Sequence, residues 1–278
     1  MTHLMTVSYN GDVSLLASEG DCYDVSSSMA LLLSQRQEEN ENQLSSDDDD
    51  ATNPELLRRY ISSIDSTLVI RQLSSRGLSF QLWPAATSLV SLLDDHRRNH
   101  SGSPLSSVFP SSGEEQPHGL RILELGSGTG FVGIAAAAIL KASVTITDLG
   151  HVVPNLKFNV MSNSDMLASN NGNVDVAELN WGHLDHMEAI GRDYDVIIGS
   201  DVVYHDHLFD PLIETLKYFL LGVDKKVVFL IAHLKRWKKE SAFFKKARKH
   251  FVVDVLHKDC PPEGQRLGVV VYCFVGKQ

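Results

Sequence analysis

Three glycines stand at every second position near the middle of the chain, as Gly126, Gly128 and Gly130. An apolar run that contains Glu124 precedes them, and an apolar-rich segment from Phe131 to Leu140 follows. We interpret this pattern as a buried strand, a tight turn with almost no side chains, and a helix. Such a turn brings backbone N–H groups and the beginning of a helix close to a ligand. The residues therefore predict a small-molecule site at the turn.

The glycine spacing alone leaves two classes of cofactor open. Gly128, Gly130 and Gly133 also satisfy the GxGxxG pattern of dinucleotide-binding enzymes, so a nicotinamide-dependent oxidoreductase is one alternative. Glu124 is poorly placed to face a pyrophosphate, and suits the amino group and sulfonium of S-adenosylmethionine instead. Asp148 ends the next predicted strand, where a carboxylate accepts hydrogen bonds from ribose hydroxyls of either cofactor. The alternative for Asp148 is an N-cap of the following helix.

A second group of polar residues, Asp201-Val-Val-Tyr204, follows the buried strand Asp195–Ile198 and Ser200. In an open parallel sheet this fourth strand lies beside the first, so its end opens onto the same crevice as the glycine turn. We therefore expect the carboxylate and the phenol to lie where a transferred group would emerge. The alternative is that Asp201 caps the next helix and Tyr204 packs in the core.

Alternating elements must position these residues. From residue 121 onward the apolar pattern predicts strands and helices in turn, which is typical of a mostly parallel sheet covered by helices on both faces. The last two strands are separated by a loop too short for a crossover helix, so we expect them to be antiparallel. The predicted strands are 121–126, 143–148, 174–179, 194–200, 225–232, 251–257 and 267–275, and the predicted helices are 130–141, 152–165, 183–190, 207–221 and 236–250.

The region before this core predicts a hairpin and a helix. The β-rich runs Thr67–Leu73 and Leu78–Trp83 flank Ser-Ser-Arg-Gly, which indicates a hairpin loop. Pro84 ends the second run, and Ala85–Arg98 has the leucine spacing of a helix. We expect 99–118 to be a flexible insertion. The domain organisation is thus an acidic tail over 1–55 and one domain over 56–278, with the hairpin and helix at 67–98 and the core at 119–278.

The composition limits the class of protein. The formal net charge is −10, but residues 1–55 hold 12 acids and one base, so the rest of the chain is nearly neutral. We expect that tail to be disordered, because like charges repel and little apolar surface is present. Three cysteines without CxxC spacing favour a reducing compartment, and we expect a cytoplasmic location, with the nucleus as a second. No apolar run approaches the ~18 residues of a membrane helix.

Taken together, the motifs resemble those of the seven-β-strand protein-lysine methyltransferases, and more narrowly methyltransferase-like family 16, of the methyltransferase-like 21 type. The resemblance covers roughly residues 67–276, whereas the tail and the insertion fall outside the family pattern. Its elements are Glu124–Gly130, Leu149 after Asp148, Leu179-Asn-Trp-Gly182, Asp201–Tyr204, the upstream Leu82-Trp83-Pro84-Ala85-Ala86, and Asn155–Asn159.

The resemblance implies an α/β, Rossmann-like sheet with strand order 3-2-1-4-5-7-6 and strand seven antiparallel. It also implies S-adenosylmethionine as the methyl donor and a lysine side chain of a protein as the acceptor. Asp201 and Tyr204 would then be the catalytic residues. Tyr204 would align the amine by its hydroxyl or ring, and Asp201, at the mouth of the site, would orient the incoming ammonium or hold the geometry of the loop. Ser200 stands where many relatives have alanine. The implied cofactor-binding residues are Trp83, Glu124, Gly126, Ser127, Gly128, Gly130, Asp148, Leu149, Trp181 and Ser200.

Other functions stay open at this stage. The basic stretch Lys235–His250 carries aromatic residues and suits phosphates, but it also suits an outer helix with a solvated face. Asp201–Tyr204 lacks the prolines of amino-adenine methylases, so we expect no nucleic-acid partner. A small-molecule methyltransferase and a non-catalytic adaptor that binds S-adenosylmethionine are further alternatives. His205-Asp206-His207 lacks a third ligand, so we expect no metal. We expect a monomer without a membrane partner.

Overall fold

A seven-stranded sheet organises the part of the chain that the structure describes. The computed structural model describes residues 54–109, 119–236, 238–261 and 268–277, all within one compact unit. The predicted acidic tail lies almost entirely outside these residues. No helix within the described ranges is long and apolar enough to cross a membrane.

The order of the strands in the sheet is β5-β4-β3-β6-β7-β9-β8. Numbered one to seven along the chain, these strands give 3-2-1-4-5-7-6, which confirms the expected topology. The pairs from β5 to β7 are parallel, whereas β9 runs antiparallel to both β7 and β8. The strands are β3 (Arg121–Leu125), β4 (Ser143–Asp148), β5 (Asn173–Glu178), β6 (Val196–Ser200), β7 (Val228–His233), β8 (Phe251–Lys258) and β9 (Val270–Gly276).

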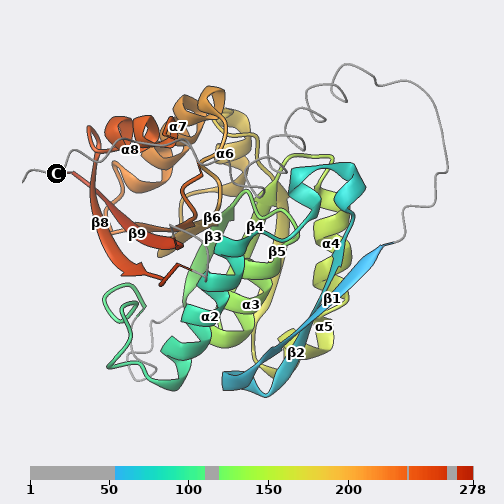
Figure 1. Cartoon of the computed structure of the whole chain (residues 1–278). Coiled ribbons are helices and arrows are strands. Elements are labelled where there is room, and N and C mark those ends of the chain that lie inside the picture. Colours follow the sequence, from blue (N-terminus) through green and yellow to red (C-terminus); the bar gives the residue numbers. More distant parts are fainter. Residues whose placement is uncertain (1–53, 110–118, 237, 262–267, 278) are drawn as a thin grey trace, which may run out of the picture. The chain divides into compact units, whose positions relative to one another are not determined.

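Helices cover both faces of the sheet, because successive strand residues are apolar on both sides. In β6, Val196 and Ile198 join one buried cluster and Ile197 joins the other. Helices α2, α3, α4 and α5 pack on the first side, and α6, α7 and α8 gather on the second (Figure 1). The helices are α2 (Pro84–Arg98), α3 (Phe131–Leu140), α4 (Val153–Met161), α5 (Ser164–Ser169), α6 (Leu184–Ile190), α7 (Phe209–Leu220) and α8 (Glu240–Ala247).

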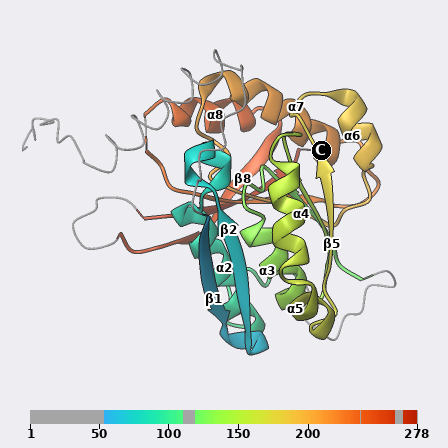
Figure 2. The same ribbon diagram turned by 90° about the vertical axis from the view of Figure 1, so that its right-hand side faces the viewer.

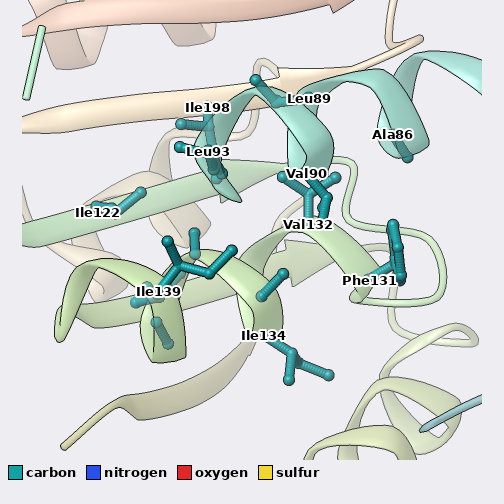
Figure 3. Close-up of a cluster of buried hydrophobic side chains, with 14 of the residues drawn as sticks. Ala86, Leu89, Val90, Leu93, Ile122, Phe131, Val132, Ile134, Ile139 and Ile198 are labelled. Carbon is teal, nitrogen blue, oxygen red and sulfur yellow. The ribbon is translucent and has the colours of Figure 1, made fainter. Parts of the chain in front are cut away.

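Helix α3, which directly follows the glycine turn, is buried almost all round. Its run of alanines allows α2 to approach closely, with Val90 of α2 lying beside Val132 of α3 and Leu93 beside Ile198 of β6 (Figure 3). Ile122 of β3 belongs to the same cluster. The turn is therefore mounted on a rigid, tightly packed helix.

The predicted hairpin is wrong in its second strand. Strand β2 (Ser66–Gln72) forms as expected, but its partner is β1 (Glu55–Ile61), upstream of it. The Leu78–Trp83 segment forms no strand: Leu78–Phe80 is a 3₁₀ turn that follows Gly77, whose φ is 114°. A side chain holds this segment instead, since the amide of Leu82 donates to Oε1 of Gln72 at 2.6 Å. Within the described residues, the first element is accordingly β1, which begins at Glu55.

The other edge of β2 is paired with asparagine side chains rather than with a strand. Helices α4 and α5 lie beside β2 (Figure 2). Asn159 belongs to α4, and Asn163, one helical turn later, directly precedes α5. The amide of Val69 donates to Oδ1 of Asn163 at 2.9 Å, and Nδ2 of Asn163 returns a bond to the Val69 carbonyl at 2.7 Å. The amide of Arg71 donates to Oδ1 of Asn159 at 2.8 Å. We call Asn155, Asn159 and Asn163 the asparagine ladder.

The expected flexible insertion is ordered in its first half. Residues 99–109 form turns that bury Leu105 and Phe109 completely, at 0% and 1% exposure. The ring of His100 lies 4.7 Å from that of His96 on α2, and Nε2 of His100 bonds the Phe109 carbonyl. Two apolar residues among serines were enough to anchor the segment. The remainder of the predicted insertion lies outside the described residues.

Two predicted helices are shorter than expected. The helix over 152–165 is divided at Ser162 and Asn163 into α4 and α5. The basic helix over 236–250 begins only at Glu240, because the residues from Leu234 to Arg236 are held by contacts with Asp201. The basic stretch is thus partly a loop that belongs to the site described next.

Candidate functional site

The glycine turn lies between the end of β3 and the beginning of α3. Gly126, Gly128 and Gly130 have φ values of 61°, 57° and 79°, a left-handed conformation that favours glycine. A Cβ on Gly126 would lie 2.9 Å from Cζ2 of Trp181 and 3.0 Å from a methyl of Val202. The turn therefore depends on glycine both for its backbone conformation and for its close neighbours.

The donors of the turn are largely used within the protein, unlike the open N–H groups expected from the sequence. The amide of Ser127 donates to the Thr147 carbonyl at 2.9 Å, that of Gly130 to the Ser127 carbonyl at 2.8 Å, and that of Gly128 to Asp148 at 2.8 Å. The Ser127 hydroxyl is buried and accepts a bond from the Thr147 amide. Ser127 thus holds the turn against β4, and Gly130 packs against Leu156.

Glu124 lies behind the turn rather than in front of it, which corrects its expected contact with a cofactor amino group. Its side chain is 1% exposed, and its Oε2 accepts a bond of 3.0 Å from the Gly133 amide at the beginning of α3. Burial raises the pKa of this carboxyl to about 8, although hydrogen bonds from Ser127 and Gly133 oppose the shift. Gly133 is needed here because a Cβ would lie 2.5 Å from Oε2 of Glu124.

Asp148 stands at the end of β4, beside the turn, as the sequence indicated. Its two oxygens accept bonds of 2.8 Å from the amides of Gly128 and Leu149, and burial raises the pKa of its carboxyl. A carboxylate has about four acceptor positions, so two remain for other donors such as hydroxyls. Leu149, next to it, is 40% exposed. The carboxylate of Asp148 accepts from amides outside a helix, and helix α4 begins only at Val153, so Asp148 does not cap α4.

Trp181 brings a third segment to the turn. It follows β5 and the buried Leu179, whose amide donates to the Asp148 carbonyl at 2.9 Å. Its half-buried ring lies against Gly126, as the Cβ distance shows. The exposed Leu149, the buried carboxylate of Asp148 and the half-buried indole of Trp181 therefore all lie at the carboxyl ends of the parallel strands.

The segment before α2 covers the other side of the turn. The Ser79 carbonyl is the nearest atom to a Cβ built on Gly128, at 3.1 Å. Trp83 precedes α2, is half-buried and donates from its indole Nε1 to the Leu78 carbonyl at 2.9 Å. Trp83 is thus tied to the 3₁₀ segment that approaches Gly128, and its contact with a cofactor stays a prediction.

Asp201 occupies the centre of a buried network. Its residue is 8% exposed and has a φ of 54°, a conformation that is strained for a residue with a side chain. Its Oδ1 accepts from the Leu234 amide at 3.0 Å, and Arg236 donates to both oxygens at 3.1 and 3.0 Å. The Ala85 amide at the beginning of α2 lies 3.4 Å from Oδ2.

This placement favours one of the two roles that the sequence left open for Asp201. A carboxylate paired with a guanidinium and two backbone amides does not face an incoming ammonium. It holds the loop over 201–204 in place, the second of the two roles considered from the sequence. Asp201 is therefore a positioning residue.

Tyr204 and Ser200 flank this network. Ser200 ends β6, where it pairs with Ala232 of β7, and is partly exposed. Tyr204 is also partly exposed, and its ring lies 4.7 Å from that of His205. Val202 between them reaches Gly126, so the loop with Tyr204 borders the glycine turn, as predicted from the neighbouring strands β3 and β6.

Sequence reasoning missed the partners of Asp201. Arg236 was included in a basic helix, although its guanidinium is only 14% exposed and also lies 5.1 Å from the ring of Trp83. Glu240 is fully buried, and its Oε2 accepts from the Arg236 amide at 3.0 Å and lies 3.2 Å from Nε2 of His233. Within the basic stretch, a single acid at Glu240 was the available signal.

The assembled residues fit a nucleoside-containing ligand. The two side chains of the turn, Ser127 and Thr129, are buried, Asp148 retains acceptor capacity, and Leu149 and Trp181 provide apolar surface on which an aromatic base stacks favourably. Among the described residues no group of three or more metal-ligating side chains occurs.

Comparisons with known proteins agree with this arrangement. A family model described as lysine methyltransferase matches residues 63–250, which include the whole site from Trp83 to Glu240. Protein N-lysine methyltransferase METTL21A of Danio rerio is 37% identical over 153 residues, 55% of this chain and 66% of that protein. EEF1A lysine methyltransferase 3 of Xenopus tropicalis is 32% identical over 142 residues, 51% of this chain and 53% of that protein.

The matched segments therefore span about half to two thirds of these relatives. EEF1A lysine methyltransferase 3 of Mus musculus is 28% identical over 187 residues, which cover 67% of this chain and 69% of that protein. A solved structure of a predicted O-methyltransferase from Agrobacterium tumefaciens shares 16% identity and a TM-score of 0.45, with 63% of this chain and 80% of that chain covered. The sequence relatives are thus the more informative comparison.

Proposed function

The chain belongs to the lysine methyltransferase family, and from this we propose that it transfers a methyl group from S-adenosylmethionine to a lysine side chain of a protein. The observation that carries the proposal is that the family match spans the glycine turn, Asp148, Trp181 and the Asp201–Tyr204 loop together. Family membership also supports this cofactor over a nicotinamide and favours catalysis over a purely binding role.

The residues around the turn suit this cofactor. Asp148 offers acceptors for ribose hydroxyls, and Trp181 and Leu149 offer surface for the adenine. Gly126 and Gly128 add no side chain to the turn, and the indole of Trp83 is bonded to the segment whose Ser79 carbonyl lies nearest to Gly128. When bound, S-adenosylmethionine supplies a methyl group activated by its sulfonium.

The protein's own task is to present a neutral amine in line with that methyl. A lysine has a reference pKa near 10.4, so roughly one in 2500 is neutral at pH 7, a cost of about 4.6 kcal/mol. Burial in a narrow channel lowers the pKa of an amine. We assign Tyr204 to alignment of the amine through its hydroxyl or ring. Alignment of reacting atoms accounts for a large part of the acceleration that such a site provides.

The nature of the acceptor follows from the relatives. EEF1A lysine methyltransferase 3 carries a protein substrate in its name, and this supports a protein acceptor for the present chain. We propose that the enzyme acts as a monomer in the cytoplasm or nucleus. The sparse cysteines support a reducing compartment, with Cys260 exposed and Cys273 buried as free thiols.

Labelling with radioactive S-adenosylmethionine tests the proposed function. The full chain is incubated with labelled cofactor and cell extract, and labelled bands are identified by mass spectrometry. We expect methyl-lysine in one or a few proteins, and no labelling with the Gly126→Val variant. Label that appears in RNA or small molecules, with none in protein, would overturn the lysine assignment.

A further inference from the structure

The carboxylate of Asp201 has a partner whose contacts reach beyond it. Arg236 donates from both terminal nitrogens to Asp201, at 3.1 and 3.0 Å, in a pair whose side chains are 14% and 4% exposed. The two residues are 35 positions apart in the sequence. This is a bidentate, largely desolvated pair, in which charge-assisted bonds fix direction as well as distance.

The same guanidinium lies 5.1 Å from the ring of Trp83. Trp83 belongs to the segment that crosses the glycine turn, where the Ser79 carbonyl approaches Gly128. Arg236 therefore contacts one residue beside the cofactor turn and one residue at the base of the acceptor loop. We call Arg236, Asp201 and Trp83 the arginine clamp.

The backbone of Arg236 is itself fixed by a buried acid. Its amide donates to Oε2 of Glu240 at 3.0 Å, in the first turn of α8, and Glu240 is fully buried beside His233 of β7. The clamp thus joins α2, the loop after β6 and the beginning of α8. Its guanidinium cannot move to solvent without breaking its contacts with Asp201 and Trp83.

Stability alone does not explain a buried ion pair such as that between Arg236 and Asp201. Buried ion pairs are often no more stabilising than apolar residues of similar size, because both charges lose their water. Here the pair also maintains a left-handed backbone at Asp201, and strain of this kind concentrates at functional sites. The lost hydration and the backbone strain are explained if the clamp holds the segment of Trp83 and the Asp201–Tyr204 loop in a fixed relative position.

We propose that Arg236 is a positioning residue that fixes the Asp201–Tyr204 loop relative to Trp83, so that the methyl donor and the acceptor lysine meet in line. This deepens the proposed function and rests on it. A displacement of about 1 Å between reacting groups costs on the order of 10²-fold in rate. Lysine does not replace arginine here, because a single ammonium neither binds both oxygens in a fork nor stacks on an indole.

The test compares Arg236→Lys and Arg236→Met with Arg248→Met, a matched change of an exposed arginine just after α8. Methylation kinetics and cofactor affinity by calorimetry are measured on each full-length variant. We expect both Arg236 variants to lose at least about tenfold in kcat, cofactor Kd to change less than about threefold, and Arg248→Met to match the wild type. In a cycle with Asp201→Asn, the two losses should be strongly non-additive.

Hydrogen exchange of backbone amides tests the arginine clamp independently of the methylation activity. The Ala85 and Leu234 amides bond Asp201, so Arg236→Met should speed their exchange at least about tenfold, whereas Arg248→Met should not. Unchanged exchange, or unchanged kcat per folded molecule despite a lower melting temperature, would overturn the clamp. A wild-type chain that methylates no protein, with exchange still altered in Arg236→Met, would instead overturn the proposed function alone.

Discussion

The two sides of the site are built in different ways. The cofactor side is formed by backbone and by residues close in sequence, since Glu124, the glycine turn and Asp148 all lie within 25 positions. The acceptor side is formed by side chains that meet over long separations, with Ala85 and Asp201 116 positions apart and Asp201 and Arg236 35 apart. The first side is therefore visible as a motif, and the second appears only once the chain is folded.

The largest effect is expected when Gly126, on the cofactor side, is replaced by a residue that disfavours its left-handed backbone conformation. Gly126→Val places side-chain atoms against Trp181 and Val202 and opposes a φ of 61°. We expect cofactor affinity and activity to fall by on the order of 100-fold. Calorimetric titration with S-adenosylmethionine measures it.

Gly222→Val is the control for this change. Gly222 has a similar φ of 64°, but a Cβ there meets nothing within 4 Å. We expect a modest stability loss and normal cofactor affinity per folded molecule. Equal losses of affinity in both variants would contradict a role for close packing at the turn.

A change on the acceptor side should separate chemistry from binding. Tyr204→Phe removes one hydroxyl from the loop that borders the turn. We expect kcat to fall by about 10- to 100-fold with cofactor Kd unchanged within about twofold. Steady-state kinetics and calorimetry check this, with Tyr218→Phe on α7 as the matched control. Weaker cofactor binding with unchanged kcat would reverse the division between the two sides.

The asparagine ladder should affect stability without affecting chemistry. Asn163→Ala leaves the Val69 amide and carbonyl without their side-chain partners. We expect a loss of about 2 to 3 kcal/mol, or roughly 5 to 10 °C in melting temperature. Asn170→Ala, which removes only a local bond to the Met166 carbonyl, is the control. A normal melting temperature for Asn163→Ala would show that the ladder does not hold the hairpin.

The last expected effect is a pH dependence of stability from Glu124. Burial raises the pKa of its carboxyl from 4.5 to about 8, so between these values the folded protein holds a proton that the unfolded chain has lost. Stability from this group therefore falls as pH rises from about 5 to 8. Glu124→Gln lacks the group, so its melting temperature should gain on that of the wild type as pH rises over this window. Melting temperatures that change with pH in the same way in Glu124→Gln and in the wild type would contradict the raised pKa of Glu124.

The sequence predicted the sheet well because its signals are local. Buried strands such as Val196–Ser200 and the glycine turn carry their own patterns of apolar residues and backbone freedom. The hairpin partner was missed because the apolar residues of Glu55–Ile61 come in pairs without the alternation of a half-buried strand, and only Ile61 is buried. Leu78–Trp83 has the composition of a strand, but Gly77 turns the chain into a 3₁₀ segment before any pairing begins.

The sequence predicted where the site residues lie better than it predicted what each residue does. Asp148, Trp181 and Tyr204 lie at the same sheet edge as the turn. Glu124 faces inward because the Gly133 amide satisfies it, a contact that spacing alone does not reveal. Asp201 was expected to be catalytic from its position after the fourth strand and from the family resemblance, and its partner Arg236 was missed because it stood in a run of bases that looked like a solvated face. Pairing between distant charges has no local signature.

The asparagine ladder also has a consequence for the order in which the protein is made. The bonds between β2 and the ladder join residues 88 and 94 positions apart, so β2 leaves the ribosome long before its partners. At roughly 5 to 20 residues per second, the delay is about 5 to 20 seconds. During that time the edge of β2 has no side chains to pair with. The nascent hairpin is therefore the part of this chain for which a chaperone would matter most.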